Sequence, residues 1–158
     1  MGGLSQSAQR VQDALQRQGL ELDVVELPSS TRTAADAAQA VGCSVGQIAK
    51  SLVFVEANKG DPVLVITSGS NRVDEKMVGG HLGSQIEMAR PDFVRERTGF
   101  SIGGVSPVGL SESILILIDE DLVQYDEIWA AAGTPNAVFR FSPADLLTLT
   151  NGEVIAVH

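Results

Sequence analysis

Two apolar runs separated by a short turn constrain the fold of this chain most strongly. Val53-Phe54-Val55 precedes the turn 58–62 (Asn-Lys-Gly-Asp-Pro), and the apolar run 63–67 follows it. This pattern predicts a β-hairpin. Because both runs are apolar on both faces rather than at alternate positions, we expect each face of the hairpin to be covered, as in the centre of a closed or sandwiched sheet.

Lys50 stands where a short helix signal enters this hairpin. It is one of three lysines in 158 residues, and Ser44 with Gln47 predicts a capped turn just before it. Lys50 shares the parity of Leu52 and Phe54, so we expect its side chain at the edge of one covered face. Two interpretations stay open. It is either a structural lysine with its amine in solvent or an ammonium at a pocket mouth that pairs with a phosphate or carboxylate.

The remaining helix and strand signals show no regular alternation. Helices are expected over residues 5–18, 34–41, 73–78, 91–97 and 143–150, and strands over residues 22–27, 85–88, 114–118, 127–132, 137–141 and 153–157. Gly79-Gly80 is expected to end the third helix. Most strands come in pairs joined by short loops, so residues 1–158 are predicted to form one α+β domain on a mainly antiparallel, barrel-like sheet with short helices around it.

A glycine-rich segment interrupts this regular structure. Residues 99–109 contain four glycines and Pro107, which predicts a shaped loop rather than a helix or strand. Glycines allow backbone N–H groups to approach a ligand closely and to stabilise a carbonyl oxygen. The alternative is a tight connection between buried elements.

Composition excludes several kinds of chemistry. One cysteine cannot form an internal disulfide, and with two histidines it cannot complete a zinc site, so no metal and no cofactor are expected. A P-loop and the Gly-x-Ser-x-Gly motif are absent, and a triad would have to use His81 or His158. The net charge of −9 disfavours binding to DNA or other duplexes. Six of the acids lie in residues 111–127, which are interpreted as a solvated turn, so an anionic ligand is expected to approach residues 72–97.

Nothing in the sequence indicates a membrane protein. The longest apolar run is strand-sized, well below the ~18 residues of a membrane span. Residues 1–5 have neither the basic nor the apolar region of a secretory signal. We therefore expect a soluble, cytoplasmic protein without a membrane partner.

Several motifs occur in an order that is typical of one family. They are Thr33-x-x-Asp36-Ala37-Ala38, the run 47–54 around Lys50, Val73-Asp74 with Lys76, Thr98-Gly99-Phe100, the loop 103–109 and Ile118-Asp119. In this order the chain resembles the YbaK/EbsC-type aminoacyl-tRNA deacylases, and it is similar to the editing domain of bacterial prolyl-tRNA synthetases. The resemblance covers the chain from about Ser5 to its end.

This resemblance implies a hydrolase that cleaves the ester between a wrong amino acid and the 3′ end of a tRNA. The substrate it suggests is tRNA-Pro carrying a small amino acid. Lys50 then holds the terminal nucleotide and the aminoacyl group and is the catalytic candidate. The substrate-binding candidates are a hydroxyl beside that lysine, the pocket-shaping loop and one further glycine: Ser51, Gly103, Gly104, Val105, Ser106, Pro107 and Gly133.

Members of this family lack a conventional nucleophile, so water or a group of the substrate attacks the ester, which agrees with the missing triad. The implied partners are the 3′ end of a misacylated tRNA and a prolyl-tRNA synthetase. Residues 131–138 contain no acid or histidine, unlike some members, which leaves the amino acid open. The alternatives are a non-catalytic module that binds tRNA ends or a synthetase, and a pocket for a small phosphorylated metabolite.

Overall fold

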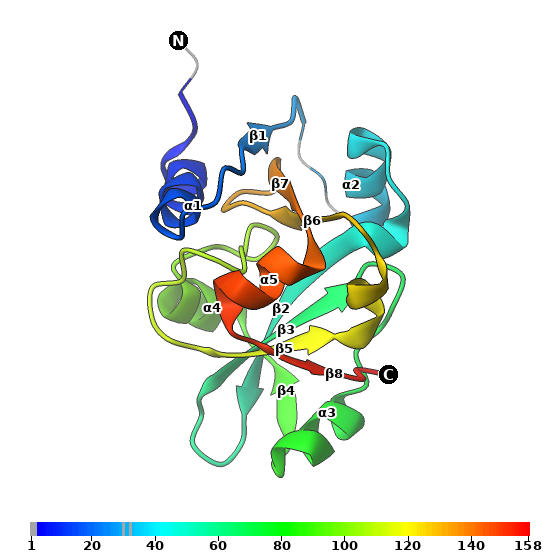
Figure 1. Cartoon of the computed structure of the whole chain (residues 1–158). Coiled ribbons are helices and arrows are strands. Elements are labelled where there is room, and N and C mark those ends of the chain that lie inside the picture. Colours follow the sequence, from blue (N-terminus) through cyan, green and yellow to red (C-terminus); the bar gives the residue numbers. More distant parts are fainter. Residues whose placement is uncertain (1–2, 30, 32) are drawn as a thin grey trace.

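The chain folds around one mixed β-sheet with helices on both sides (Figure 1). The computed structural model describes residues 3–29, 31 and 33–158, so Met1 and Gly2, on which the expectation of no secretory signal partly rests, lie outside the described residues. The elements are α1 (Gln6–Arg17), β1 (Val24–Glu26), α2 (Ala34–Val41), the 3-10 turn η1 (Val45–Gln47), β2 (Ile48–Glu56), β3 (Pro62–Ser68), α3 (Glu75–Leu82), β4 (Ile86–Met88), α4 (Pro91–Thr98), β5 (Leu115–Asp119), the 3-10 turn η2 (Glu120–Gln124), β6 (Ile128–Ala131), β7 (Ala137–Phe141), α5 (Pro143–Thr150) and β8 (Glu153–Ile155).

Among the described residues the strand order is β1-β7-β6-β2-β3-β5-β8, and β4 also pairs with β2. The pairs β2–β6, β3–β5 and β5–β8 are parallel, whereas β1–β7, β2–β3, β2–β4 and β6–β7 are antiparallel. The combination of α and β elements is therefore confirmed, but a mainly antiparallel, barrel-like sheet is not found. The reason is the long connection from β3 to β5, which includes α3 and α4 and lets β5 enter parallel to β3.

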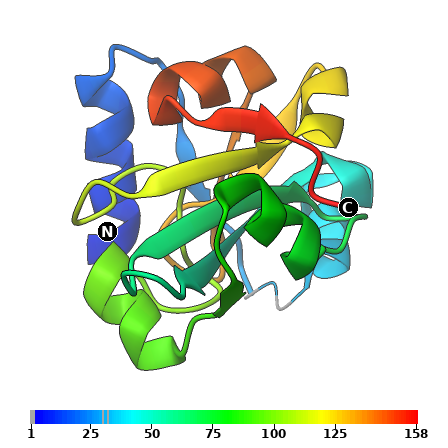
Figure 2. The same ribbon diagram turned by 90° about the horizontal axis from the view of Figure 1, so that it is seen from below.

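The predicted hairpin is confirmed as β2 and β3, and both of its faces are covered. Leu64 and Ile66 of β3 lie in the main core with residues of α1, α5, β5, β6 and β7. Val63 and Val65 face the opposite way and pack with Val78 of α3 and with residues of β5 and β8. Figure 2 shows α3 lying over this second face. The alternation of side chains along β3 thus divides residues 63–66 between two cores, and every residue of the strand is buried.

Local capping sets most helix boundaries where the sequence predicts them. The Thr33 hydroxyl accepts a hydrogen bond from the Asp36 N–H at the start of α2, and Ser142 caps α5 in the same way. The expected end of α3 at Gly79-Gly80 is wrong, because the helix continues to Leu82. Gly79 serves close packing instead, since an added Cβ would lie 2.6 Å from the Ser84 carbonyl oxygen. Within the described ranges, no helix is both long enough and apolar enough to cross a membrane.

Candidate functional site

Lys50 lies in the third position of β2, half-buried, directly after the capped turn η1. Its ammonium donates a hydrogen bond to the Asn71 carbonyl oxygen at 3.2 Å. Burial lowers the pKa of this amine relative to a free lysine. Lys50 pairs across the hairpin with Thr67 of β3, so the two side chains share one face of the sheet.

A buried carboxylate, Asp119, holds Asn71, whose carbonyl accepts the hydrogen bond from Lys50. Asp119, at the end of β5, is fully buried and accepts hydrogen bonds from the Thr67 hydroxyl and the Ser68 N–H, each at 2.9 Å. It also accepts from the Asn71 side-chain amide at 2.8 Å, and the same amide donates to Asp121 at 2.7 Å. Asp119 therefore fixes the residue whose carbonyl holds the Lys50 ammonium.

The sequence interpretation missed this role, because it treated the acids of residues 111–127 as a solvated turn. For Asp119 that interpretation is wrong. Two signals could have found it. Asp119 directly follows a fully apolar strand run, and it belongs to the Ile118-Asp119 motif of the resemblance.

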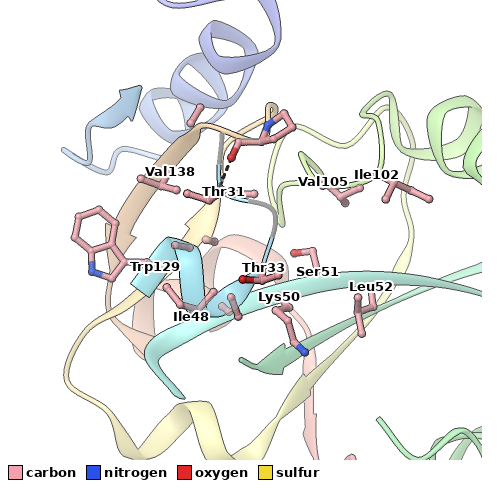
Figure 3. Close-up of a pocket in the computed structure, with 18 of the residues that line it drawn as sticks. Thr31, Thr33, Ile48, Lys50, Ser51, Leu52, Ile102, Val105, Trp129 and Val138 are labelled. Atoms are coloured by element: carbon pink, nitrogen blue, oxygen red, sulfur yellow. Dashed lines mark hydrogen bonds between the residues drawn. The ribbon is translucent and has the colours of Figure 1, made fainter. Parts of the chain in front are cut away.

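Ser51 turns to the other face of β2. Figure 3 shows the Lys50 amine and the Ser51 hydroxyl on opposite sides of the strand. The Ser51 Oγ is the one buried side-chain polar atom in the described part of the chain that has no hydrogen-bond partner. A buried hydroxyl without a partner is energetically unfavourable, so this atom is a candidate contact for a ligand.

A cavity of about 260 Å³ runs along β2, and both residues line it. Its walls are mostly aliphatic and come from α2, β2, β4, α4, the glycine loop, β6 and β7. Met88 and Ile102 stand at its border with about half of their surface exposed. Thr31 and Trp129, which the sequence did not single out, also line it, and so does Thr33 (Figure 3). In the sequence Thr33 belongs to a family motif, and in the structure it both caps α2 and lines the cavity.

The glycine loop supplies one wall of the cavity. Gly103 and Val105 line it directly. Gly104 packs closely against Gly133. An added Cβ at Gly104 would lie 2.7 Å from the Gly133 carbonyl oxygen, so only glycine fits here. Gly133 in turn packs on the backbone of Ser7 in α1, where an added Cβ would be 2.6 Å from the carbonyl oxygen. These contacts place the loop at a fixed distance from α1.

Two loop residues do not reach the cavity. Ser106 is fully buried, and its hydroxyl accepts a hydrogen bond from the Val108 N–H at 3.1 Å within the loop. Pro107 lines a separate depression beside α5. The structure thus brings together Lys50, Ser51, Gly103 and Val105 around one cavity, with Gly104 and Gly133 behind its wall and Ser106 and Pro107 away from it.

The arrangement suits one kind of ligand. A small aliphatic cavity can accept a small uncharged group, and Lys50, which also lines it, carries an amine that can attract an anionic or strongly polar attachment. Neither His81 nor His158 lines the cavity, and His81 instead contacts Glu153 at 3.1 Å. The fold and the site therefore define an α/β domain with one small, mostly aliphatic cavity that Lys50 and Ser51 both line.

Comparison with known proteins identifies the family. The aminoacyl-tRNA editing domain matches residues 28–149. The YwhH protein of Bacillus subtilis (strain 168), which is uncharacterised, is 33% identical over 85% of each chain. A protein of Enterococcus faecalis (strain ATCC 700802 / V583), provisionally named Cys-tRNA(Pro)/Cys-tRNA(Cys) deacylase EbsC, is 31% identical over 77% of this chain and 74% of its own.

A solved structure agrees with these sequence relatives. It is described provisionally as a trans-editing enzyme for prolyl-tRNA synthetase, and it superposes with a TM-score of 0.93 at 52% identity over 98% of each chain. The chain belongs to the aminoacyl-tRNA editing domain family, as the motif order predicted.

Proposed function

We propose that this protein is a trans-editing deacylase that hydrolyses the ester of a misacylated tRNA. The substrate we expect is tRNA-Pro carrying a small wrong amino acid. The observation that supports this most directly is the pairing of a half-buried ammonium, Lys50, with a small aliphatic cavity that contains the unpartnered Ser51 hydroxyl. The family and the provisional descriptions of its relatives point to the same reaction.

The size of the cavity favours a small amino acid. At about 260 Å³ it lies slightly below the ~300–1,000 Å³ of typical ligand pockets. The aminoacyl group can enter, and the nucleotide that bears it remains outside, beside Lys50. The acidic surface is compatible with this substrate, because only the single-stranded 3′ end of the tRNA has to be bound.

Positioning is sufficient for the chemistry we propose. An aminoacyl ester is already reactive, so an attacking water or a neighbouring hydroxyl of the substrate needs orientation and stabilisation of the carbonyl oxygen rather than a protein nucleophile. Lys50 acts as the group that holds the substrate. We place the protein in the cytoplasm, with misacylated tRNA as its partner and a prolyl-tRNA synthetase as the enzyme whose errors it corrects.

The experiment incubates the purified protein with tRNA-Pro misacylated with alanine, cysteine, serine or threonine and measures the remaining ester. We expect hydrolysis of at least one of them and its loss in Lys50→Ala. If none is hydrolysed, or if Lys50→Ala hydrolyses them at the normal rate, the proposal is wrong.

A second function is favoured by one observation, the absence of a histidine or carboxylate among the described residues that line the cavity. The protein would then bind tRNA ends or a synthetase without catalysis. Binding of misacylated tRNA that requires Lys50 but leads to no turnover would support this alternative.

A further inference from the structure

One edge of β2 is incompletely paired where it borders the cavity. On the side opposite β3, β6 pairs with Ile48 and Ala49, and β4 pairs with Phe54 to Glu56. No described strand pairs with residues 50–53 on this side. The cavity is lined by β2 in this gap, by Ala130 and Ala131 at one end of it and by Met88 and Ala89 at the other.

The register of the hairpin shows which backbone groups face the gap. The Gly69 N–H donates to the Ile48 carbonyl at 2.7 Å, so the Ile48 carbonyl points to the β3 side. Bonding alternates along an antiparallel pair, so Lys50 and Leu52 also direct their N–H and C=O groups to β3. Ser51 and Val53 direct theirs to the gap.

Val53 is already used there, because its carbonyl accepts from the Ala89 N–H at 3.0 Å. Ser51 is therefore the residue of the gap whose N–H and C=O both lack a strand partner in the described ranges. Its hydroxyl, which is buried and also unpartnered, lies in the same cavity. The N–H, the C=O and the hydroxyl of Ser51 are thus three polar groups at the cavity for which the described residues supply no partner.

We infer that the open edge at Ser51 binds the α-aminoacyl group of the substrate as one added residue of the sheet, and that the site therefore requires a free amine and the L configuration. The inference rests on the proposed function for the identity of the ligand. An α-aminoacyl group has one N–H donor and one carbonyl acceptor in the arrangement of a strand residue. In an antiparallel pair two such residues exchange both hydrogen bonds.

The direction of this pairing agrees with the position of Lys50. Antiparallel to β2, the amino end of the ligand points to Ala89 and its carbonyl end points back toward Lys50. The ester then lies at the Lys50 end of the gap, where Ala130 and Ala131 also border the cavity. The Ser51 N–H donates to the ester carbonyl oxygen, on which negative charge develops during hydrolysis.

The same geometry defines what is rejected. The space beyond the ligand's amine is occupied by Ala89, whose N–H is bonded to Val53, so an acyl group on the amine has no room. Directly opposed L residues place their side chains on the same face of a sheet. An L side chain therefore enters the face of Ser51 and Val105, whereas a D side chain meets the face of Lys50.

The test measures binding rather than turnover, with three stable amides by calorimetry. The probes are 3′-(L-alanylamino)-3′-deoxyadenosine, its N-acetyl derivative and its D-alanyl isomer. We expect the L compound to bind at least about tenfold more tightly than either of the others, as the loss of one or two hydrogen bonds requires. Equal binding within about threefold, or no binding of the L compound at about 1 mM, overturns the inference.

Ser51→Ala serves as the matched variant because it keeps the backbone groups and removes only the hydroxyl. We expect it to retain both preferences; their disappearance would assign the recognition to the hydroxyl and contradict the role of the edge. The proposed function fails separately. If the protein discriminates among the amides but hydrolyses no misacylated tRNA, the proposed function is wrong and the binding site at the β2 edge is supported. If it hydrolyses misacylated tRNA but does not discriminate among the amides, only the inference about the edge is wrong.

Discussion

The two faces of β2 differ in how completely their polar groups are satisfied. On the face of Lys50, the ammonium, the Asn71 amide and the buried Asp119 carboxylate all have partners within 3.2 Å. On the face of Ser51, a hydroxyl without a partner stands in an aliphatic cavity. The polar groups of the first face are satisfied within the chain, whereas the Ser51 hydroxyl of the second has no partner among the described residues. A satisfied hydrogen-bond network fixes the position of a functional group. A buried polar group without a partner is energetically unfavourable, so a ligand that bonds it gains affinity.

The largest expected effect comes from Lys50→Ala, which removes the charge that the first face holds in place. We expect hydrolysis of misacylated tRNA to fall about 100-fold, as for the loss of a charged contact to a ligand. The melting temperature should change little, because the amine bonds only one carbonyl. Rates from single-turnover assays and thermal melts test this together.

Lys59→Ala is the control for this change. It removes the same charge from the exposed turn between β2 and β3 and should leave the rate unaltered. A comparable loss in both variants would mean that net charge, and not the position of Lys50, controls substrate binding.

Asp119→Ala tests whether the network on the Lys50 face is structural. The substitution leaves the Thr67 hydroxyl and the Ser68 N–H without their acceptor, and the Asn71 amide keeps only Asp121. We expect a loss of about 3 kcal/mol in the free energy of unfolding, or about 6–12 °C in melting temperature. Hydrolysis should also fall about tenfold, because the Asn71 carbonyl is no longer anchored.

The neighbouring Asp121→Ala provides the comparison, since Asp121 is partly exposed. Its melting temperature should fall by less than about 2 °C. If the two variants melted alike, the burial of Asp119 would not be what stabilises this face.

These residues also show what the sequence could predict. The hairpin, the caps at Thr33 and Ser142, the irregular loop after α4 and the family follow from local patterns and motif order. Lys50 was predicted as a site residue because a single charge within an apolar run can be recognised from a few neighbouring residues.

The missed features depend on contacts between distant segments. Asp119 is bonded by Thr67, Ser68 and Asn71, which lie far from it in the sequence. A local sequence pattern cannot show that these residues are in contact in the fold. The parallel pairs depend on the path of the long crossover. The gap at Ser51 depends on where β6 and β4 stop pairing, which is a property of the assembled sheet.

Arg10 offers a test of the other face, where the glycine loop forms the cavity wall. Its guanidinium in α1 donates to the carbonyls of Gly109 at 2.6 Å, Thr98 at 3.0 Å and Gly99 at 3.3 Å. It also lies over the Phe100 ring, 4.4 Å from its centre. Arg10→Ala should cost about 2 kcal/mol and loosen the wall, so that discrimination between alanyl and prolyl esters falls severalfold.

Two controls accompany this variant. Arg10→Lys keeps the charge but cannot span three carbonyls, so it should restore only part of the stability. Arg17→Ala, at the exposed end of the same helix, should change neither melting nor discrimination. If Arg10→Ala were less stable but discriminated between the esters as well as the unchanged protein, the glycine loop would not determine which amino acid is accepted.

The smallest expected effect lies at the outer end of the network, where His158 contacts Asp121 at 3.0 Å. The hydrogen bond to Asp121 raises the pKa of His158, and the bonds from His158 and Asn71 lower the pKa of Asp121. The histidine's contribution is complete below its unfolded pKa of about 6.5 and is lost as pH rises through the raised value. The aspartate's contribution is complete above its unfolded pKa of about 3.9 and is lost as pH falls through the lowered value.

The pair should therefore stabilise most between about pH 4 and pH 6.5. Because neither side chain is buried, we expect His158→Gln to lower the melting temperature by only about 1–2 °C at pH 5.5 and by less at pH 8.5. Melting curves of both proteins across this range measure the difference. A difference that grew toward pH 8.5 would show that His158 stabilises through packing and not through its charge, and the network would then end at Asp121.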